Sequence, residues 1–165
     1  MKVLWAPWRL SYVGESVPPS GCIFCDKPCL QTADDRRRDL VLRTTETTAV
    51  IMNLYPYANG HLLVAPRVHT CDFPGLDAKI GNDLQREIAL CVDVLTRAYA
   101  PAGFNIGMNL GRAGGAGIAD HLHWHVVPRW EGDTNFMPML ADTRVIPQHI
   151  EDAYDRLLPL FEDAR

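Results

Sequence analysis

The sequence predicts an α+β fold: an antiparallel sheet of about five strands, with one long helix and a short C-terminal helix. Short segments rich in Val, Ile and Thr alternate with turn residues, and one stretch between 75 and 100 repeats apolar residues at spacings of three and four. The chain has 165 residues, 47% of them hydrophobic, which is enough for one sizeable core. We therefore expect a single domain over 1–165.

The first 39 residues are expected to form an irregular N-terminal arm. Four prolines between positions 7 and 28 interrupt any regular period, and the mixed charges at 34–39 are typical of a solvated loop. Trp5, Trp8 and Tyr12 would pin this arm by packing against the domain or against a partner subunit, with stacking on a ligand as the alternative.

The core is expected over 40–150 and begins with three strands. Leu40–Arg43, Thr47–Leu54 and His61–Pro66 have the composition of strands, and Tyr55–Gly60 supplies the turn residues between the second and the third. An antiparallel meander is the natural topology for strands joined this closely.

The long helix is predicted over Gly75–Ala100, with its apolar stripe on the sheet and a proline directly after it. A fourth strand at Gly103–Leu110 and a fifth at His121–Val127 are expected to pair side by side. After a loop at 129–147, a short helix over 149–161 closes the chain.

Charge and cysteine content narrow the function classes. A net charge of −4 argues against binding to a nucleic acid polymer or an anionic membrane, and no apolar run is long enough to span a bilayer. The five cysteines are an odd number, and Cys22 and Cys25 have the two-residue gap of a metal knuckle or a redox pair. We expect a cytoplasmic protein with reduced thiols, in which Cys71 and Cys91 are core or near-core residues.

The segment from His121 to Val127 carries the clearest chemical signal. Its three histidines alternate with apolar residues, so that in a strand the imidazoles share one face. The glycine-rich segment 109–117 lies just upstream, and its small residues would let backbone N–H groups approach an anion. The pattern indicates a phosphate site with a nucleophile, although imidazole is also a common zinc ligand.

This pattern resembles the signature of the histidine triad superfamily, His-φ-His-φ-His-φ-φ with φ apolar. Residues 53–66 are similar to the ribose-binding strand and turn of that family. Segments 103–111 and 127–136 resemble the branch that contains the bacterial diadenosine tetraphosphate phosphorylases. The resemblance covers roughly residues 40 to 150.

The resemblance implies covalent catalysis on a nucleotide. His123 is the expected nucleophile on the α-phosphorus, and His125 is expected to hold a phosphate oxygen. Many members carry Ser or Thr three residues before the first histidine, where this chain has Ile118, so other groups would have to replace that hydroxyl. The nucleotide- and phosphate-binding residues implied are Asn53, Asn109, Gly115, Ala116, Gly117, Ile118 and His125.

The resemblance also implies a structural zinc ion. Its ligands would be Cys22, Cys25, His69 and His121, a closed set that leaves no position for a reactive water. Mg²⁺ is a possible companion of a polyphosphate substrate. Relatives of this kind are commonly homodimers.

The leading hypothesis is therefore a nucleotidyl transferase or hydrolase that cleaves dinucleoside polyphosphates, with phosphate or water as the acceptor. A nucleoside phosphoramidate hydrolase would use the same site. Two further readings are a nucleotide-binding regulatory module with little turnover and a zinc scaffold in which the triad binds metal only. His61 is expected to pack beside the site, and His149 to open the last helix without a further role.

Overall fold

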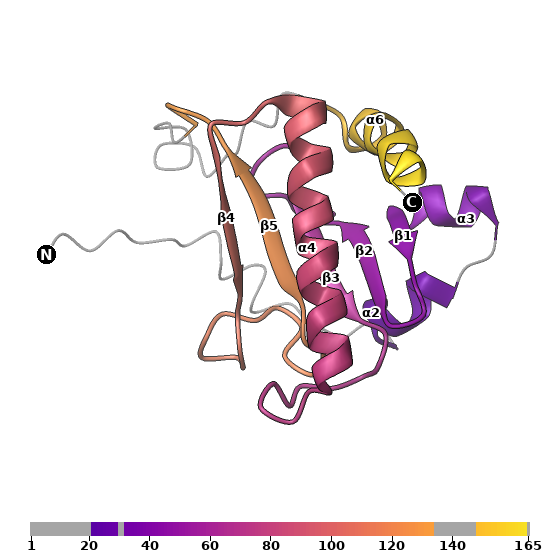
Figure 1. The fold of residues 1–165 in the computed structure, drawn as a ribbon, viewed down its shortest axis with the longest axis vertical. Coiled ribbons are helices and arrows are strands. Elements are labelled where there is room, and N and C mark those ends of the chain that lie inside the picture. The colour runs from indigo at the N-terminus through magenta and orange to yellow at the C-terminus, as the bar shows by residue number, and fades with distance from the viewer. Residues whose placement is uncertain (1–20, 30–31, 134–147, 165) are drawn as a thin grey trace, which may run out of the picture.

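The centre of the fold is a five-stranded antiparallel sheet (Figure 1). This computed structural model describes residues 21–29, 32–133 and 148–164. The strands are β1 (Val41–Thr44), β2 (Thr48–Met52), β3 (Leu62–Pro66), β4 (Gly103–Met108) and β5 (Trp124–Arg129). Every neighbouring pair is antiparallel, which confirms the predicted fold class.

The strand order is β1-β2-β3-β5-β4. The first three strands form the predicted meander, and β5 returns to lie between β3 and β4. The fifth strand thus pairs with the fourth, as expected, but it also becomes an inner strand of the sheet. This arrangement places the start of β5 beside the end of β3, so that residues distant in sequence meet there.

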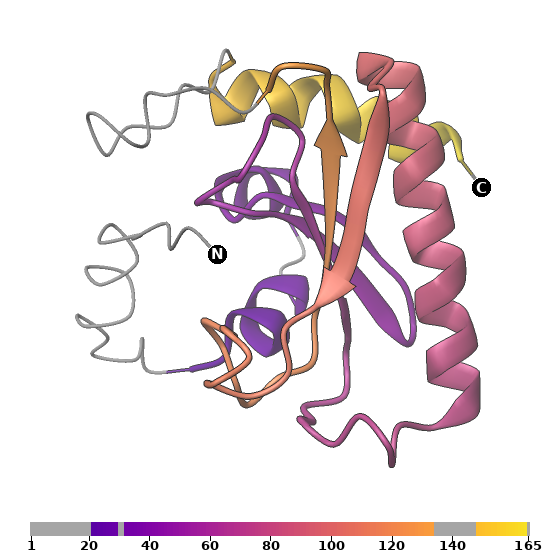
Figure 2. The same cartoon turned by 90° about the vertical axis from the view of Figure 1, so that its left-hand side faces the viewer.

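Helix α4 (Ala78–Tyr99) lies across one face of the sheet (Figures 1 and 2). It starts later than predicted because the Asp77 side chain caps it, accepting from the backbone N–H groups of Lys79 and Ile80. It ends at Tyr99, and the C-cap residue Ala100 has a left-handed φ of 43° directly before Pro101. Its buried apolar face is formed by Leu84, Ile88, Cys91, Val94, Leu95 and Ala98.

Helix α6 (Ile150–Asp163) packs against α4 and β1 and agrees with the predicted C-terminal helix. Tyr154 is buried there and donates a hydrogen bond to the carbonyl of Val41 at 3.0 Å. His149 is the N-cap residue of α6 and makes no side-chain capping bond. This end of the chain is therefore fixed to the long helix and to the first strand.

The described part of the arm is helical, which corrects the expectation of an irregular segment. It contains α2 (Ile23–Asp26), the 3₁₀ turn η1 (Lys27–Cys29) and α3 (Ala33–Arg38). The Thr32 side chain caps α3 by accepting from the N–H of Asp35, so the charged run forms a helix and not a loop. Helix α2 lies on the face of the sheet opposite α4 (Figure 2).

The fifth strand starts at Trp124, three residues later than predicted. The N–H of Leu122 bonds to the carbonyl of Thr70 at 2.8 Å, so this backbone meets a loop instead of a neighbouring strand. Cys91 is buried as expected, but Cys71 is exposed because it lies in the loop before α4. Trp5, Trp8 and Tyr12 of the arm and most of the predicted 129–147 loop fall outside the described residues.

None of the described helices combines the length and the apolar composition that a membrane crossing requires.

Candidate active site and metal centre

The three histidines of the motif lie at the start of β5. His125 pairs in register with Leu63 of β3 and with Gly107 of β4, which fixes its position between two strands. His121 and His123 precede the strand and are 1% and 5% exposed. The ring centroids of His123 and His125 are 5.2 Å apart. The structure thus brings the predicted row together, and hydrogen bonds assign a different chemistry to each ring.

The first ring, His121, has its lone pair on Nδ1. Its Nε2 lies 2.8 Å from the carbonyl oxygen of Pro66. A carbonyl can only accept, so Nε2 carries the proton and Nδ1 does not. That Nδ1 lies 3.2 Å from Sγ of Cys22 and 3.6 Å from Sγ of Cys25. His121 therefore presents an electron pair to two sulfur atoms.

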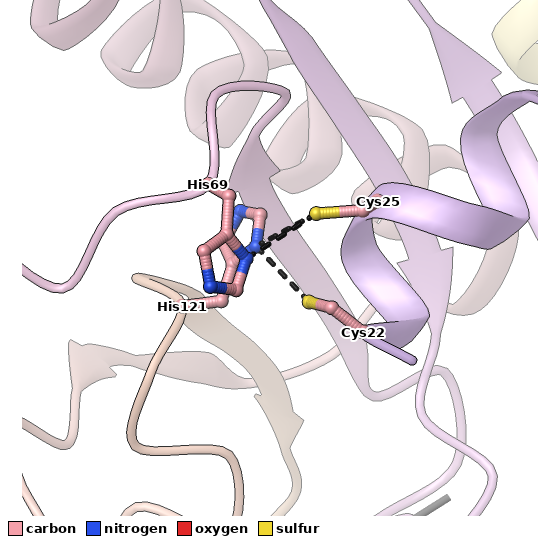
Figure 3. Close-up of side chains that lie close together, drawn as sticks. All are labelled: Cys22, Cys25, His69 and His121. Carbon is pink, nitrogen blue, oxygen red and sulfur yellow. Dashed lines mark hydrogen bonds between the residues drawn. The ribbon is translucent and has the colours of Figure 1, made fainter. Parts of the chain in front are cut away.

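His69 completes a Cys₂His₂ cluster with these three residues (Figure 3). Its Nδ1 is 3.3 Å from Sγ of Cys25, and the four ligand atoms all lie within 4.8 Å of one another. In a tetrahedral zinc site, bonds of about 2.3 Å to sulfur and 2.0 Å to nitrogen give sulfur–nitrogen separations of about 3.5 Å. The observed separations of 3.2 to 3.6 Å fit that geometry. The four predicted ligands can thus surround one cation.

The two sulfur atoms of this cluster favour a bound cation. Burial, followed by the hydrogen bond to and the charge of neighbouring Cys22, raises the pKa of the Cys25 thiol from 9.0 to about 11. Two adjacent thiolates repel each other unless positive charge lies between them. A divalent metal supplies that charge and deprotonates its thiol ligands.

The second ring, His123, has its lone pair on Nε2. Its Nδ1 donates to the carbonyl oxygen of His121 at 2.9 Å, which places the proton on Nδ1. Burial lowers the pKa of His123, so the ring is neutral near pH 7. The Phe24 ring stacks on it with centroids 4.8 Å apart and holds its plane. A neutral imidazole fixed in this way is suited to nucleophilic attack through Nε2.

The third ring, His125, presents a proton. The backbone N–H of Tyr57 donates to Nδ1 of His61 at 3.1 Å, so the proton of neutral His61 is on Nε2. That Nε2 lies 2.9 Å from Nδ1 of His125, which must accept. Neutral His125 therefore carries its proton on Nε2, a buried atom with no hydrogen-bond partner among the described residues.

His125 also stays neutral over a wide pH range. Burial, and to a smaller extent the charge of His123, lowers its pKa from 6.5 to about 4. A neutral ring with a buried, unpartnered N–H is a suitable donor to a phosphate oxygen.

The glycine-rich segment forms a compact loop. Gly115 has a φ of 89°, and a Cβ on Gly114 would lie 2.3 Å from the carbonyl oxygen of Leu110, so both positions require glycine. Asn109 donates from its side chain to the carbonyl of Gly115 at 3.3 Å. The loop is therefore held in shape by its own contacts.

Of the predicted phosphate donors, two make hydrogen bonds within this loop. The N–H of Gly115 bonds to the carbonyl of Arg112, and that of Ala116 bonds to the carbonyl of Gly111. Ile118 is half-buried and packs against the hydrophobic core. Gly117 lies between these two environments. Gly117 and Ile118 are the other two residues of this segment that the resemblance implies as phosphate-binding.

Asn53 lies at the end of β2 and contacts the histidine row through His61. Its Nδ2 is 3.2 Å from Nδ1 of His61, and its Oδ1 accepts from the N–H of Tyr55 at 3.0 Å. The sequence prediction assigned Asn53 to ribose. In the structure it belongs to the same hydrogen-bonded group as His125.

Two aromatic residues contact the site although the histidine and cysteine motifs do not include them. Phe24 lies between the two cysteines of the knuckle, and its spacing gives no sign that it stacks on His123. The ring of Tyr57 is 4.7 Å from that of His61 and lies nearly parallel to that of His125 at 5.9 Å. The repeated aromatic residues of 55–57, next to a Gly-His pair, are a signal that could have suggested a packed site.

A neutral imidazole with its lone pair on Nε2, a neighbouring N–H donor and a Cys₂His₂ cluster along one histidine row define a histidine triad protein. Comparisons with known proteins agree. The family model described as HIT domain matches residues 36–132. The chain belongs to the HIT family, and within it to the branch similar to AP-4-A phosphorylase.

Three relatives illustrate the similarity. The AP-4-A phosphorylase of Mycobacterium tuberculosis is 35% identical over 157 residues, which cover 90% of this chain and 78% of that protein. The adenosine 5'-monophosphoramidase hnt1 of Schizosaccharomyces pombe is 26% identical, over 66% of this chain and 74% of that protein. The solved structure of a Zn-bound histidine triad family protein from Mycobacterium smegmatis has a TM-score of 0.67 at 22% identity, covering 87% and 94% of the two chains. Family and relatives support an enzyme of the HIT type that acts on nucleotides.

Proposed function

We propose that this protein cleaves dinucleoside polyphosphates, with diadenosine tetraphosphate as the leading substrate, through a covalent nucleotidyl-histidine at His123. The observation that carries the proposal is the hydrogen bond from Nδ1 of His123 to the carbonyl of His121, which leaves the lone pair on Nε2. The similarity to an AP-4-A phosphorylase over most of the chain supports the choice of substrate.

The chemistry would proceed in two displacements. In the first, Nε2 of His123 forms a bond to the α-phosphorus, and the bond from that phosphorus to the bridging oxygen breaks. ATP leaves with the electron pair, and the ring becomes a positively charged adenylyl-imidazole whose Nδ1–H remains on the His121 carbonyl. In the second, an oxygen of inorganic phosphate or water bonds to the same phosphorus, and the bond to Nε2 of His123 breaks with its electron pair returning to the ring. ADP or AMP leaves, while any proton on the attacking oxygen passes to solvent.

The neighbouring groups would stabilise the charge on the transferred phosphate. The Nε2–H of His125 would donate to a non-bridging oxygen, which is where negative charge develops. Asn53, Asn109 and the loop over 115–118 are proposed to hold the nucleotide. Mg²⁺ would act only as a companion of the polyphosphate.

We propose zinc as the ion held by Cys22, Cys25, His69 and His121. Two thiolates and two imidazoles are a donor set typical of structural zinc, and the relative from Mycobacterium smegmatis is zinc-bound. The ion would tie helix α2 to the start of β5, and with four protein ligands it takes no part in the chemical steps.

A nucleoside phosphoramidate hydrolase is the second candidate, because hnt1 is a monophosphoramidase and the same Nε2 could attack a P–N substrate.

A homodimer is also proposed. Strand β4 is at the edge of the sheet, and Ile106 on it is 48% exposed. Size-exclusion chromatography with light scattering would give the mass.

The proposed function is tested by incubating the protein with diadenosine tetraphosphate, with and without inorganic phosphate, and separating the products by chromatography. We expect ADP and ATP with phosphate, and AMP and ATP if water is the acceptor. His123→Ala should abolish turnover. Rapid denaturation of the wild type at alkaline pH, where the P–N bond of a nucleotidyl-histidine is stable, should trap labelled nucleotide on the protein.

His149→Ala is the matched control, because His149 is exposed at the start of α6 and belongs neither to the histidine row nor to the Cys₂His₂ cluster. It should retain wild-type activity. Turnover of a phosphoramidate alone would favour the second candidate. Nucleotide binding without turnover of either substrate would contradict both and favour a regulatory module.

A further inference from the structure

His61 is hydrogen-bonded both to His125 and to Asn53. A substitution of Asn53 by aspartate would replace a donor to the His61 ring by an acceptor. His61 is 1% exposed and lies between His125 and the end of β2. Its Nδ1 faces two groups at once, the backbone N–H of Tyr57 at 3.1 Å and Nδ2 of Asn53 at 3.2 Å.

The orientation of the Asn53 amide is fixed independently of His61. The backbone N–H of Tyr55 lies 3.0 Å from one terminal atom of the Asn53 side chain. Because an N–H can only donate, that atom is the oxygen, and the other is the NH₂ group. Asn53 therefore donates to Nδ1 of His61.

We propose that Asn53 is a positioning residue: its amide, together with the backbone N–H of Tyr57, keeps His61 in the Nε2–H tautomer and thereby keeps a proton on Nε2 of His125. Two donors on one ring nitrogen exclude a proton from it. The proton of His61 then points to Nδ1 of His125, 2.9 Å away, and this nitrogen accepts. The arrangement of protons is thus transmitted through two hydrogen bonds from the end of β2 to the substrate side of the row.

An aspartate at this position would oppose the arrangement. A carboxylate only accepts, so it would place an electron pair against that of Nδ1 of His61. The conflict with the carboxylate is removed when Nδ1 takes a proton, either by a switch of tautomer or by protonation of the ring, and Nδ1 then no longer accepts from the N–H of Tyr57. After a tautomer switch, Nε2 of His61 would accept from Nδ1 of His125, and the Nε2–H of His125 would be lost.

The test is long-range ¹H–¹⁵N correlation NMR on protein labelled at the histidine ring nitrogens, with the metal bound, at neutral pH. Signals are assigned with His61→Gln and His125→Gln. In the wild type we expect Nδ1 unprotonated and Nε2 protonated on both rings. Asn53→Asp should give a protonated Nδ1 on His61.

Asn59→Asp is the matched control. It adds the same charge to the same loop, but its amide contacts Gln148 and not the histidine pair. It should leave both tautomers unchanged. A proton on Nδ1 of either ring in the wild type, unchanged signals in Asn53→Asp, or an equal change in Asn59→Asp would each overturn the proposal.

The catalytic consequence rests on the proposed function and is measured separately. Asn53→Ala and Asn53→Asp both remove the amide, but only Asp opposes the tautomer. We expect kcat of Asn53→Asp to be at least about tenfold below that of Asn53→Ala, since one lost donor to a developing oxyanion costs about 10² to 10³ in kcat. Equal kcat values would overturn this consequence. No turnover in the wild type with the tautomers as described would instead overturn the proposed function.

Discussion

The two ends of the histidine row use the same tautomer in opposite ways. His121 and His125 both carry the proton on Nε2. At His121 the carbonyl of Pro66 takes that proton, and the lone pair on Nδ1 faces the cysteines. At His125 the lone pair is taken by His61, and the proton has no partner among the described residues. The role of each ring therefore depends on which of its two nitrogens is hydrogen-bonded by a neighbouring element of the fold.

The two ends also differ in how they are held. The metal end joins helix α2, the loop after β3 and the loop before β5, with no ladder of strand hydrogen bonds between them. The His125 end lies within the sheet, paired on both sides. We infer that the first end depends on a bound ion and the second on the packing of the sheet, so that substitutions can separate them.

The largest expected effect is on the metal end. Cys22→Ser, or removal of the ion by a chelator, should lower the free energy of unfolding by several kcal/mol, since binding of structural zinc contributes about 10 kcal/mol or more to the folding of small zinc domains. Metal content by mass spectrometry and urea denaturation check this. Cys71→Ser is the control, because Cys71 is exposed and outside the cluster. Near-stoichiometric metal and an unchanged midpoint in Cys22→Ser would contradict the prediction.

The next effect is on the His125 end. His125→Ala removes the unpartnered N–H, and kcat should fall by about 10² to 10³ while metal content stays the same. Steady-state kinetics with diadenosine tetraphosphate measure it. A raised KM with unchanged kcat would show instead that His125 binds substrate and transition state equally.

The predictable parts of this fold are those with local signals. The long helix has a regular apolar period with Asp77 before it and Pro101 after it, and both ends are set by these residues. The Cys-x-x-Cys spacing and the alternating histidines are likewise visible in short stretches of sequence. The cap of α3 was visible too, as Thr32 three residues before Asp35, but the charges around it favoured a loop.

The remaining features depend on contacts between distant segments. The start of β5 is displaced because Leu122 bonds to Thr70, 52 residues earlier in the chain by their numbers. The proton on each ring depends on carbonyl and N–H groups of other elements, such as Pro66 for His121. No local pattern encodes these partners. The alternating histidines can therefore be predicted from the sequence, but the nitrogen that carries the proton on each ring cannot.

The dependence of stability on pH should reveal the lowered pKa of His125. Its pKa is about 4 in the folded protein, against 6.5 for an ordinary histidine. Between these values the unfolded chain binds a proton that the folded ring does not, so stability falls as pH decreases from 6.5 to 4. Urea denaturation across this window should show a shallower decline in His125→Ala than in the wild type. Parallel curves would mean that His125 titrates normally.

The smallest expected effect tests whether the two ends are coupled. The Phe24 ring stacks on His123 and lies 5.2 Å from the ring of His121, so it contacts both parts of the row. Phe24→Leu keeps an apolar side chain and should cost at most about 1.5 kcal/mol of stability. The loss of a ring pair worth about 0.5 to 1.5 kcal/mol should lower kcat about two- to tenfold.

Phe161→Leu is the matched control for Phe24→Leu, since Phe161 is equally buried but lies in α6. It should lower stability by a similar amount and leave kcat unchanged. Metal affinity, measured by competition with a chromogenic chelator, should be the same in both variants, because the four ligands remain in place. If Phe24→Leu weakened metal binding and kcat together, the two ends would act as one unit, and the separation inferred from their hydrogen bonds would be wrong.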